Sequence, residues 1–169
     1  MTRVPGLGAD AATCPEIAIW PAARVPGFRR ADVTTRLGTG DDLWRRASRD
    51  VRRWVVKTRS GFTVDDDSPV RAGMRLTITA RVLGIRVHEP VRVVAVVDTP
   101  TRVGFAYRAL PGHPVHGEEA FVVHRRGDEV VFTVRSLTAP APSGRWRWVF
   151  PLLRVAQVVA RRRYLRALR

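Results

Sequence analysis

The sequence predicts an α+β fold, in which a curved antiparallel sheet is covered by one long C-terminal helix and a shorter helix follows the first strand. Apolar and polar residues alternate with period two over much of residues 74–137, which is the spacing of half-buried strands. Residues 43–57 and the C-terminal segment repeat their apolar positions at helical spacing instead. A half-buried sheet needs a cover for its apolar face, and the final helix is long enough to provide it.

The first thirty residues are predicted to be an irregular leader. They contain four prolines and scattered glycines, and no apolar run long enough to be a signal peptide. We expect this leader, residues 1–30, to pack on a single domain formed by residues 31–169. The length of 169 residues fits one domain.

The domain is predicted to begin with a short strand and a helix. Residues 33–37 alternate weakly, and the polar turn 39–42 offers a helix N-cap. Residues 43–57 then form a helix with one apolar face. A second short strand is expected at 61–65.

Most of the sheet is expected after residue 74. The three adjacent aspartates at 65–67 lie in a polar turn and lack the Gly and terminal Glu of a calcium-binding loop. Alternation predicts strands at 74–82, 85–89, 91–97, 102–109, 119–124 and 129–137. Connections this short produce an antiparallel meander.

The last element is predicted to be a helix that starts near Arg145 or Pro151, because proline is favoured in the first helical turn. Its apolar stripe comprises Val149, Leu152, Leu153, Ala156, Val159, Ala160, Tyr164 and Leu168. A curved sheet that holds such a helix leaves a concave, mostly apolar space suited to a small molecule.

The net charge is the most extreme feature of the composition. The formal charge is +15 at pH 7, and every basic residue except Lys57 is Arg. Residues 130–169 hold nine Arg and no acid, with five of these in residues 161–169. Such a cluster can attract nucleic acid or anionic lipid. An arginine-rich genome together with the solvated back of a helix explains it better, so we do not expect a nucleic-acid partner.

The sequence is typical of a cytoplasmic protein. The most apolar stretch, residues 148–160, carries Arg154 and Gln157 and is shorter than the ~20 apolar residues of a membrane span. Cys14 is the single cysteine, so no intramolecular disulfide can form. The sequence leaves the oligomeric state open.

Strong catalytic motifs are missing from the sequence. It has no P-loop, no G-x-S-x-G, no H-E-x-x-H and no paired C-x-x-C. Residues 6–11 fit a loose dinucleotide pattern, but no strand precedes them and no amphipathic helix follows. We therefore predict no cofactor.

The segment 107–121 gathers the most chemistry and is predicted to be largely a loop between two strands. His113 beside Glu118 or Glu119 has the minimum equipment for general acid–base catalysis, because His titrates near neutrality and a carboxylate can orient it. Tyr107 is a further catalytic candidate. The alternative is a Pro-Gly turn in which His113 and Glu118 hydrogen-bond the loop backbone.

A zinc site is the weaker interpretation of the same loop. His113, His116 and either carboxylate have suitable donor atoms, but no helix aims the two rings of the H-x-x-H pair at one point. We therefore predict no metal.

Other residues of the expected sheet and helix are candidates for contacting a ligand. Tyr107 shares a strand face with Phe105, so its ring is buried and its hydroxyl needs a partner. His124 is expected on an inward face with Ala120 and Val122. Trp148 is expected in the core or the wall of a cavity.

Several runs of the sequence resemble an uncharacterised family, domain-of-unknown-function family nineteen-ninety. They are VVAVVD at 93–98, RVGFAY at 102–107, LPGHP at 110–114, GEEAF at 117–121 and RYLRAL at 163–168. The order of elements is also similar to the START-like (SRPBCC) helix-grip superfamily, where a seven-stranded sheet wraps a C-terminal helix around an apolar cavity. That resemblance implies an apolar ligand, since members include lipid carriers and polyketide cyclases, but the fold does not specify the function.

Two positions depart from the pattern of that family. A Gly usually follows the Tyr and an acidic residue usually follows the His-Pro pair, where this chain has Arg108 and Val115. If that acid were catalytic, the activity would be lost or moved here. Arg108 and His116 would then recognise a specialised ligand.

Three functions follow as hypotheses. The first is binding of an apolar or amphipathic small molecule between sheet and C-terminal helix. The second is an enzyme, a cyclase, dehydratase or isomerase of a polyketide-like substrate, with His113 as acid or base and Tyr107 or Arg108 steadying an oxyanion. The third is binding of anionic membrane or nucleic acid through the basic C-terminal helix. The ligand-contacting candidates are Phe105, Tyr107, Arg108, His116, His124 and Trp148.

Overall fold

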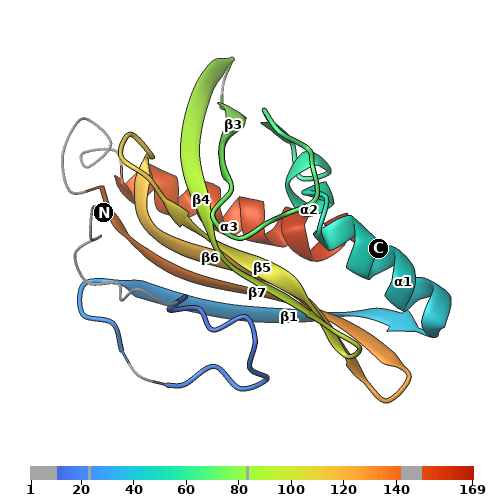
Figure 1. Ribbon diagram of the computed structural model, residues 1–169. Helices are drawn as coiled ribbons and strands as arrows, with labels where there is room; N and C mark the ends of the chain where they lie inside the picture. The colour runs from blue at the N-terminus through green and yellow to red at the C-terminus, as the bar shows by residue number, and fades with distance from the viewer. Residues whose placement is uncertain (1–10, 23, 83, 142–149) are drawn as a thin grey trace.

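The computed structural model confirms the predicted fold class (Figure 1). It describes residues 11–22, 24–82, 84–141 and 150–169, and their side chains except those of residues 82 and 150–154. The elements are β1 (Arg29–Thr39), α1 (Asp41–Val51), α2 (Val55–Thr58), β2 (Phe62–Val64), β3 (Arg75–Val82), β4 (Ile85–Thr99), β5 (Arg102–Ala109), β6 (Val115–Arg126), β7 (Glu129–Pro140) and α3 (Phe150–Ala167).

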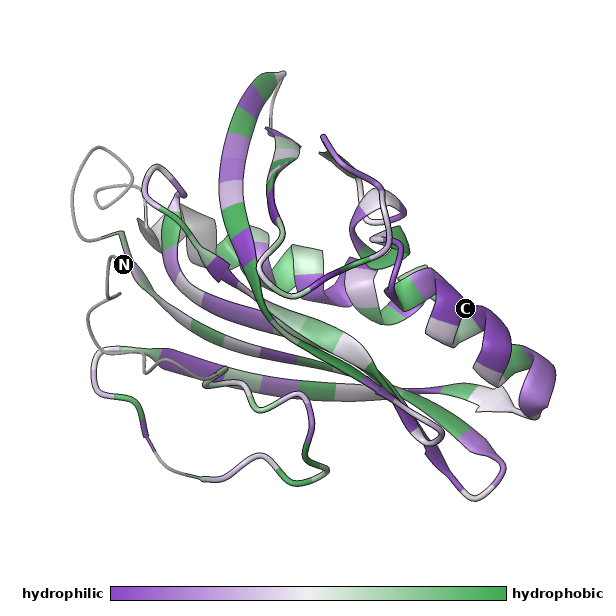
Figure 2. Ribbon diagram, viewed as in Figure 1, coloured by the Kyte–Doolittle hydropathy of each residue, from purple (hydrophilic) through white to green (hydrophobic). Residues whose placement is uncertain are grey.

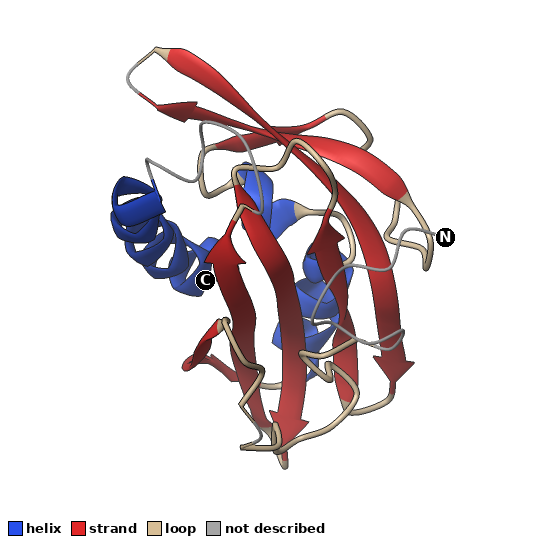
Figure 3. Cartoon of the chain, turned by 90° about the vertical axis from the view of Figure 1, so that its left-hand side faces the viewer, coloured by secondary structure: helices blue, strands red, loops and turns tan. Residues whose placement is uncertain are grey.

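The seven strands form one antiparallel sheet in the order β1-β7-β6-β5-β4-β3-β2. β2 to β7 follow one another as a meander, and β1 joins its far edge beside β7. In Figures 1 and 3 the three helices lie on one side of the curved sheet. Figure 2 shows hydrophobic and hydrophilic residues alternating along the strands, as expected for strands with two different faces.

The predicted helix 43–57 is wrong as one element, because the structure divides it into α1 and α2. Trp54 lies between them with φ 60°, in the left-handed region, a conformation that costs a non-glycine residue ~1 kcal/mol. Its indole is fully buried, with its ring centroid 4.8 Å from that of Phe105. Burial of the indole offsets the backbone cost, and α2 carries Lys57 into the core.

Several strands are longer than predicted. β1 pairs with β7 from Arg29 onward, and the expected strands 85–89 and 91–97 are one strand, β4. β4 continues through Pro90, whose carbonyl accepts a hydrogen bond from the N–H of Leu110. β6 begins at Val115, so the loop expected up to residue 119 ends at residue 114. Strand pairing with β7 along its whole length explains this extension.

The C-terminal helix α3 packs through its last two turns. Tyr164, Ala167 and Leu168 are buried in the main core, whereas Val155 and Val159 are 63% and 42% exposed. The predicted apolar stripe is therefore confirmed for Tyr164 and Leu168 and not for Ala156 and Val159, while Val149 and the side chains of Leu152 and Leu153 lie outside the described part. Within the described part of the chain, no helix has the length and apolarity needed to cross a membrane.

The two faces of the sheet have different covers. The main core lies on the concave face, between the strands and the helices, and includes Phe105, Phe121 and Phe132. On the opposite, convex face a smaller apolar cluster forms around Trp20 of the leader and Leu137 of β7. A side chain's position along a strand therefore decides whether it meets the helices or the leader.

Candidate functional site

The only lysine of the chain is the centre of a buried polar cluster. Lys57 on α2 is 2% exposed, in a chain whose other 29 basic residues are all Arg. Its ammonium lies near four aromatic rings, an arrangement that stabilises a desolvated cation. The distances from Nζ to the ring centroids are 4.6 Å for Tyr164, 4.8 Å for Phe62, 5.0 Å for Tyr107 and 5.4 Å for Phe121.

Hydrogen bonds join this lysine to β6 and α3, and through Glu119 to β5. Lys57 Nζ donates to Glu119 Oε2 at 3.0 Å and to the hydroxyl of Tyr164 at 2.6 Å. The hydroxyl of Tyr107 donates to the same Glu119 oxygen at 2.5 Å. We call these four residues, together with Glu89 of β4, the Lys57 cluster. They bring together two carboxylates, one ammonium and two phenols inside an apolar core.

The sheet register explains why the floor of this cluster forms. Tyr107 on β5 lies directly opposite Glu119 on β6, and Glu119 lies opposite Ser136 on β7. Residues that are directly opposite one another project from the same face. The buried hydroxyl of Ser136 has no hydrogen-bond partner in the described part of the chain. The floor of the cluster therefore has a hydroxyl, that of Ser136, which can form a further hydrogen bond.

Glu89 has an unusual electrostatic position in the cluster. Burial raises the pKa of Glu89 to about 7, the charge of Lys57 opposes that rise, and the charge of Glu119 adds to it. Burial, followed by the negative charge of Glu119, also raises the pKa values of Tyr107 and Tyr164 well above their usual range. At neutral pH the phenols are hydrogen-bond donors, and Glu89 is the group that can exchange a proton.

His113 lies in the β5–β6 turn, where its Nδ1 accepts a hydrogen bond from the N–H of Val115 at 3.0 Å. Burial, followed by the positive charge of Lys57, lowers the pKa of His113 to about 3. An imidazole with this pKa is neutral at pH 7 and is a weak base. In this structure His113 is therefore a neutral hydrogen-bond acceptor, and its acid–base role stays a prediction.

The structure separates the residues that the sequence grouped into one loop. Tyr107, Glu119 and Phe105 share the concave face, and the charge of Lys57 reaches His113. The strand positions of the other candidates turn them toward the leader, so that their roles at a ligand site stay untested predictions: they are Arg108, His116, Glu118 and His124. Trp148 lies outside the described residues.

The two adjacent glutamates show the reason most clearly. Both belong to β6, and neighbouring residues of a strand point to opposite faces. Glu118 Oε1 accepts hydrogen bonds from Thr13 N at 2.8 Å and Thr13 Oγ1 at 2.5 Å, and its Oε2 lies 2.8 Å from Arg108 Nη2. Its side chain is fully buried. Glu118 thus attaches the leader to the sheet.

Two more arginines of the convex face hold the leader. Arg102 Nε donates to the carbonyl of Pro15 at 2.6 Å. Arg135 donates to the carbonyls of Cys14 and Ala18 at 2.6 and 2.8 Å. His124, on the same face, has a pKa lowered to about 4 by burial and then by Arg102. Part of the Arg excess therefore satisfies the backbone of the leader.

Glu118→Gln is expected to loosen the leader. The substitution removes the charge that Arg108 and Thr13 share, and a buried charged hydrogen bond contributes ~1.5–3 kcal/mol. Cys14 reports the change, because it is the single thiol, it is half-buried, and burial raises its pKa. Alkylation of Cys14 should accelerate at least ~10-fold, while the exposed control Glu129→Gln should keep the wild-type rate. An unchanged rate would show that Glu118 does not hold the leader.

Three residues of the candidate site were not predicted from the sequence: Lys57, Glu89 and Tyr164. Lys57 offered a signal, because it is the single lysine beside 29 arginines and an ammonium is not interchangeable with a guanidinium. Glu89 offered a weaker one, as an acid between Val87 and Val91 on the apolar face of its strand. In the part of the chain that the structure describes, no three His, Cys, Asp or Glu residues are grouped as metal ligands would be.

The curved seven-stranded sheet with its C-terminal helix is the helix-grip fold of START-like proteins. Three solved structures share it. A hypothetical protein from Helicobacter pylori has a TM-score of 0.61 at 14% identity, covering 89% of this chain and 92% of its own. The Zhui aromatase/cyclase from Streptomyces sp. R1128 has a TM-score of 0.58 at 16% identity (83% and 91%). A START superfamily protein from Mycobacterium smegmatis has a TM-score of 0.54 at 12% identity (84% and 94%).

The chain belongs to the domain of unknown function family DUF1990, whose model matches residues 12–167. A UPF0548 protein of Deinococcus radiodurans is 30% identical over 161 residues, which cover 86% of this chain and 79% of that protein. The resemblance found in the sequence is therefore confirmed.

Proposed function

We propose that the protein binds an apolar or amphipathic small molecule between the concave face of its sheet and α3, with the Lys57 cluster as the polar anchor. The observation that carries this proposal is the ion pair between buried Lys57 and Glu119, whose side chain is 17% exposed, in a core that otherwise consists largely of apolar side chains. Ligand sites in proteins are mostly apolar with a few polar groups that orient the ligand. The START-like fold supports small-molecule binding as well.

We do not expect the stability of the fold to require the ion pair of this polar cluster. Replacing a buried ion pair with apolar residues of similar volume is often neutral or stabilising. The unpartnered hydroxyl of Ser136 beside Glu119 is a further unused polar group on the same face. A ligand hydroxyl or carbonyl would find both donors and acceptors here. This supports an amphipathic ligand over a purely apolar one.

Binding can be tested with the neutral dye N-phenyl-1-naphthylamine, since an anionic dye would also be attracted to the arginines. Lys57 is the only lysine, so selective ¹³C labelling of lysine gives a single side-chain NMR signal. We expect saturable binding of one dye per protein and a shift of that signal. Native mass spectrometry of the gently purified protein should also show a bound compound.

A surface control separates this proposal from adventitious binding. Val155 and Val159 are exposed on α3 and could hold a dye by themselves. In the variant Val155→Ser/Val159→Ser the dye affinity and the Lys57 shift should both remain. Dye binding that disappears in this variant, or that leaves the Lys57 signal unmoved, would contradict a site at the cluster.

A second candidate function is acid–base catalysis, and the pKa of Glu89 favours it. A carboxyl with a pKa of about 7 is suited to remove and return a proton at neutral pH. Glu89 would take the α-proton of a carbonyl substrate, and the phenol of Tyr107 or the ammonium of Lys57 would stabilise the enolate oxygen. Enolisation of this kind begins the cyclisation, dehydration or isomerisation of a polyketide-like substrate.

Catalysis can be tested with a β-keto thioester, S-acetoacetyl-N-acetylcysteamine, in D₂O. NMR follows the exchange of its α-protons, which needs no knowledge of the natural substrate. We expect the protein to accelerate exchange and Glu89→Gln to remove at least ~100-fold of that acceleration. Glu129→Gln, an exposed carboxylate on β7, should leave the rate unchanged. If Glu89→Gln exchanges the α-protons as fast as the wild type does, Glu89 is not the group that transfers the proton.

A further inference from the structure

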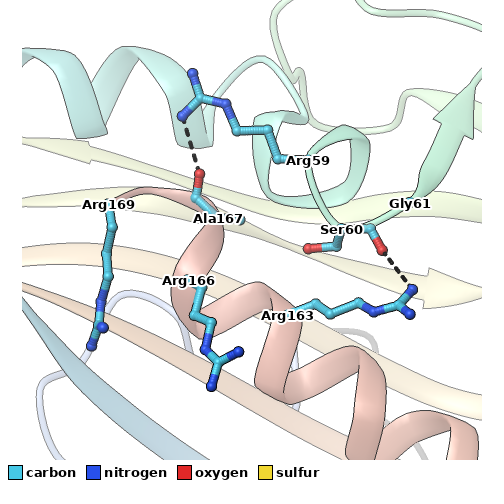
Figure 4. Close-up of a pocket in the computed structure, with 7 residues that line it drawn as sticks. All are labelled: Arg59, Ser60, Gly61, Arg163, Arg166, Ala167 and Arg169. Carbon is cyan, nitrogen blue, oxygen red and sulfur yellow. Dashed lines mark hydrogen bonds between the residues drawn. The ribbon is translucent and has the colours of Figure 1, made fainter.

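A second site lies on the outside of the junction between α2 and α3. A groove of about 820 Å³ runs between the turn that follows α2 and the last turn of α3 (Figure 4). It is lined by Arg59, Ser60, Gly61, Arg163, Arg166, Ala167 and Arg169. Four of these seven residues are arginines, and none is acidic. We call this the arginine groove.

The arginines of the groove keep most of their donors free. Each guanidinium has five N–H groups. Within the described chain these four side chains donate three hydrogen bonds: Arg59 Nη1 to Ala167 O at 3.1 Å, Arg163 Nη1 to Ser60 O at 3.4 Å and Arg169 Nη2 to Thr35 Oγ1 at 3.0 Å. All three acceptors are neutral, so these bonds leave the positive charges uncompensated.

Few negative charges oppose this cluster. Asp50 lies 3.9 Å from Arg59, whereas Arg163, Arg166 and Arg169 form no ion pair with any carboxylate of the described chain. The C-terminal end of α3 contributes roughly −0.5 of an elementary charge. The positive charge of the groove clearly exceeds that amount, so the groove attracts anions.

The side chain of Ser60 adds a neutral donor to the wall. Ser60 is buried, and its hydroxyl has no hydrogen-bond partner in the part of the chain that the structure describes. Figure 4 shows this hydroxyl directed from the turn toward the end of α3. An unpartnered buried hydroxyl is rare in folded proteins and indicates a missing partner. Arginine forks and a serine hydroxyl together are a set of groups that suits phosphate oxygens.

We infer that the arginine groove binds a small molecule with at least two phosphate groups. A single carboxylate would leave most of the positive charge uncompensated, whereas two phosphates carry about three negative charges near pH 7. The groove is open to solvent, and its volume exceeds the space that one phosphate fills. The Lys57 cluster is not part of this inference.

The test uses tripolyphosphate as the soluble probe, with binding measured by calorimetry at 50 and 200 mM salt. We expect one site per protein and at least a tenfold loss of affinity in Arg163→Gln/Arg166→Gln. The matched control is Arg46→Gln/Arg53→Gln, two exposed arginines near α1 without an ion pair, which loses the same charge. At 200 mM salt its affinity should stay within about twofold of the wild type, because neither arginine lines the groove and salt screens exposed charges that do not contact the ligand.

A second arm distinguishes a soluble ligand from a lipid headgroup. Vesicles of phosphatidylcholine with and without phosphatidylinositol 4,5-bisphosphate are sedimented with the protein and both variants. Co-sedimentation that needs the bisphosphate and is lost only in Arg163→Gln/Arg166→Gln supports the site with a membrane lipid as its source. Equal losses of tripolyphosphate or vesicle binding in both variants would overturn the inference. Duplex DNA is tested in the same way, and binding to DNA alone, with a steep salt dependence, would overturn it as well.

Discussion

Lys57→Met is expected to lower the free energy of unfolding by ~3–5 kcal/mol, although it replaces a buried charge with an apolar side chain of similar length. The substitution leaves the largely buried carboxylate of Glu119 without its cation, and the hydroxyl of Tyr107 is its remaining hydrogen-bond donor in the described structure. Equilibrium unfolding in urea, followed by tryptophan fluorescence, measures the change. The surface substitution Arg45→Met, which breaks only an exposed pair with Asp42, should cost less than ~1 kcal/mol.

The double variant Lys57→Met/Glu119→Gln supplies the decisive comparison. It removes both charges, and we expect it to recover most of the lost stability. We expect the double variant to fold even if Lys57→Met alone does not. The contribution of the ion pair can then be assessed in either case. A double variant as stable as the wild type would mean that the ion pair is dispensable for folding. A Lys57→Met protein within ~1 kcal/mol of the wild type would instead show that Glu119 is well solvated without its partner.

The sheet could be predicted because its signal is local. Period-two alternation identified β3, β5 and β7 nearly to their observed ends, and short turns implied their antiparallel order. The boundaries of β6 could not be predicted, because residues 115–118 have little apolar alternation and become a strand by pairing with β7. Gly117 is needed there, since a Cβ on it would stand 1.9 Å from the carbonyl oxygen of Leu137.

The candidate site was predicted only in part, and the cause is geometric. Tyr107 and Glu119 were predicted as site residues from the segment 107–121. Their neighbours Arg108 and Glu118 were assigned to the same loop. Once β6 is a strand, alternation separates these two pairs onto opposite faces of the sheet. The sequence also could not place Lys57, because the break at Trp54 that directs α2 inward depends on tertiary burial of the indole.

Charge was the most visible feature of the sequence, and the structure divides it among several roles. Arg102, Arg108 and Arg135 hold the leader on the convex face. Arg163, Arg166 and Arg169 lie together in the arginine groove. Composition alone does not distinguish these two groups, because both consist of the same residue. The distinction lies in what each guanidinium contacts.

Glu89→Gln is expected to stabilise the protein at alkaline pH. The pKa of Glu89 is about 7 in the folded state and 4.5 as its ordinary value. Below pH 4.5 the carboxyl is protonated in both states and contributes no difference. Between pH 4.5 and 7 unfolding releases a proton, so wild-type stability falls as pH rises, and above pH 7 the full loss of ~3 kcal/mol is present. Gln cannot ionise, so the variant avoids that loss.

The measurement is the difference in unfolding free energy between Glu89→Gln and the wild type at pH 4.5, 6 and 8. Folded-state pKa values of about 3 and about 4 for His113 and His124 make both proteins gain stability as pH rises toward 6.5. This opposing trend cancels in the difference, which should rise by ~3 kcal/mol from pH 4.5 to 8. The exposed control Glu129→Gln should give a nearly flat difference. A flat result for Glu89→Gln would mean that Glu89 ionises like a surface carboxylate, which would remove the basis for a proton-transfer role.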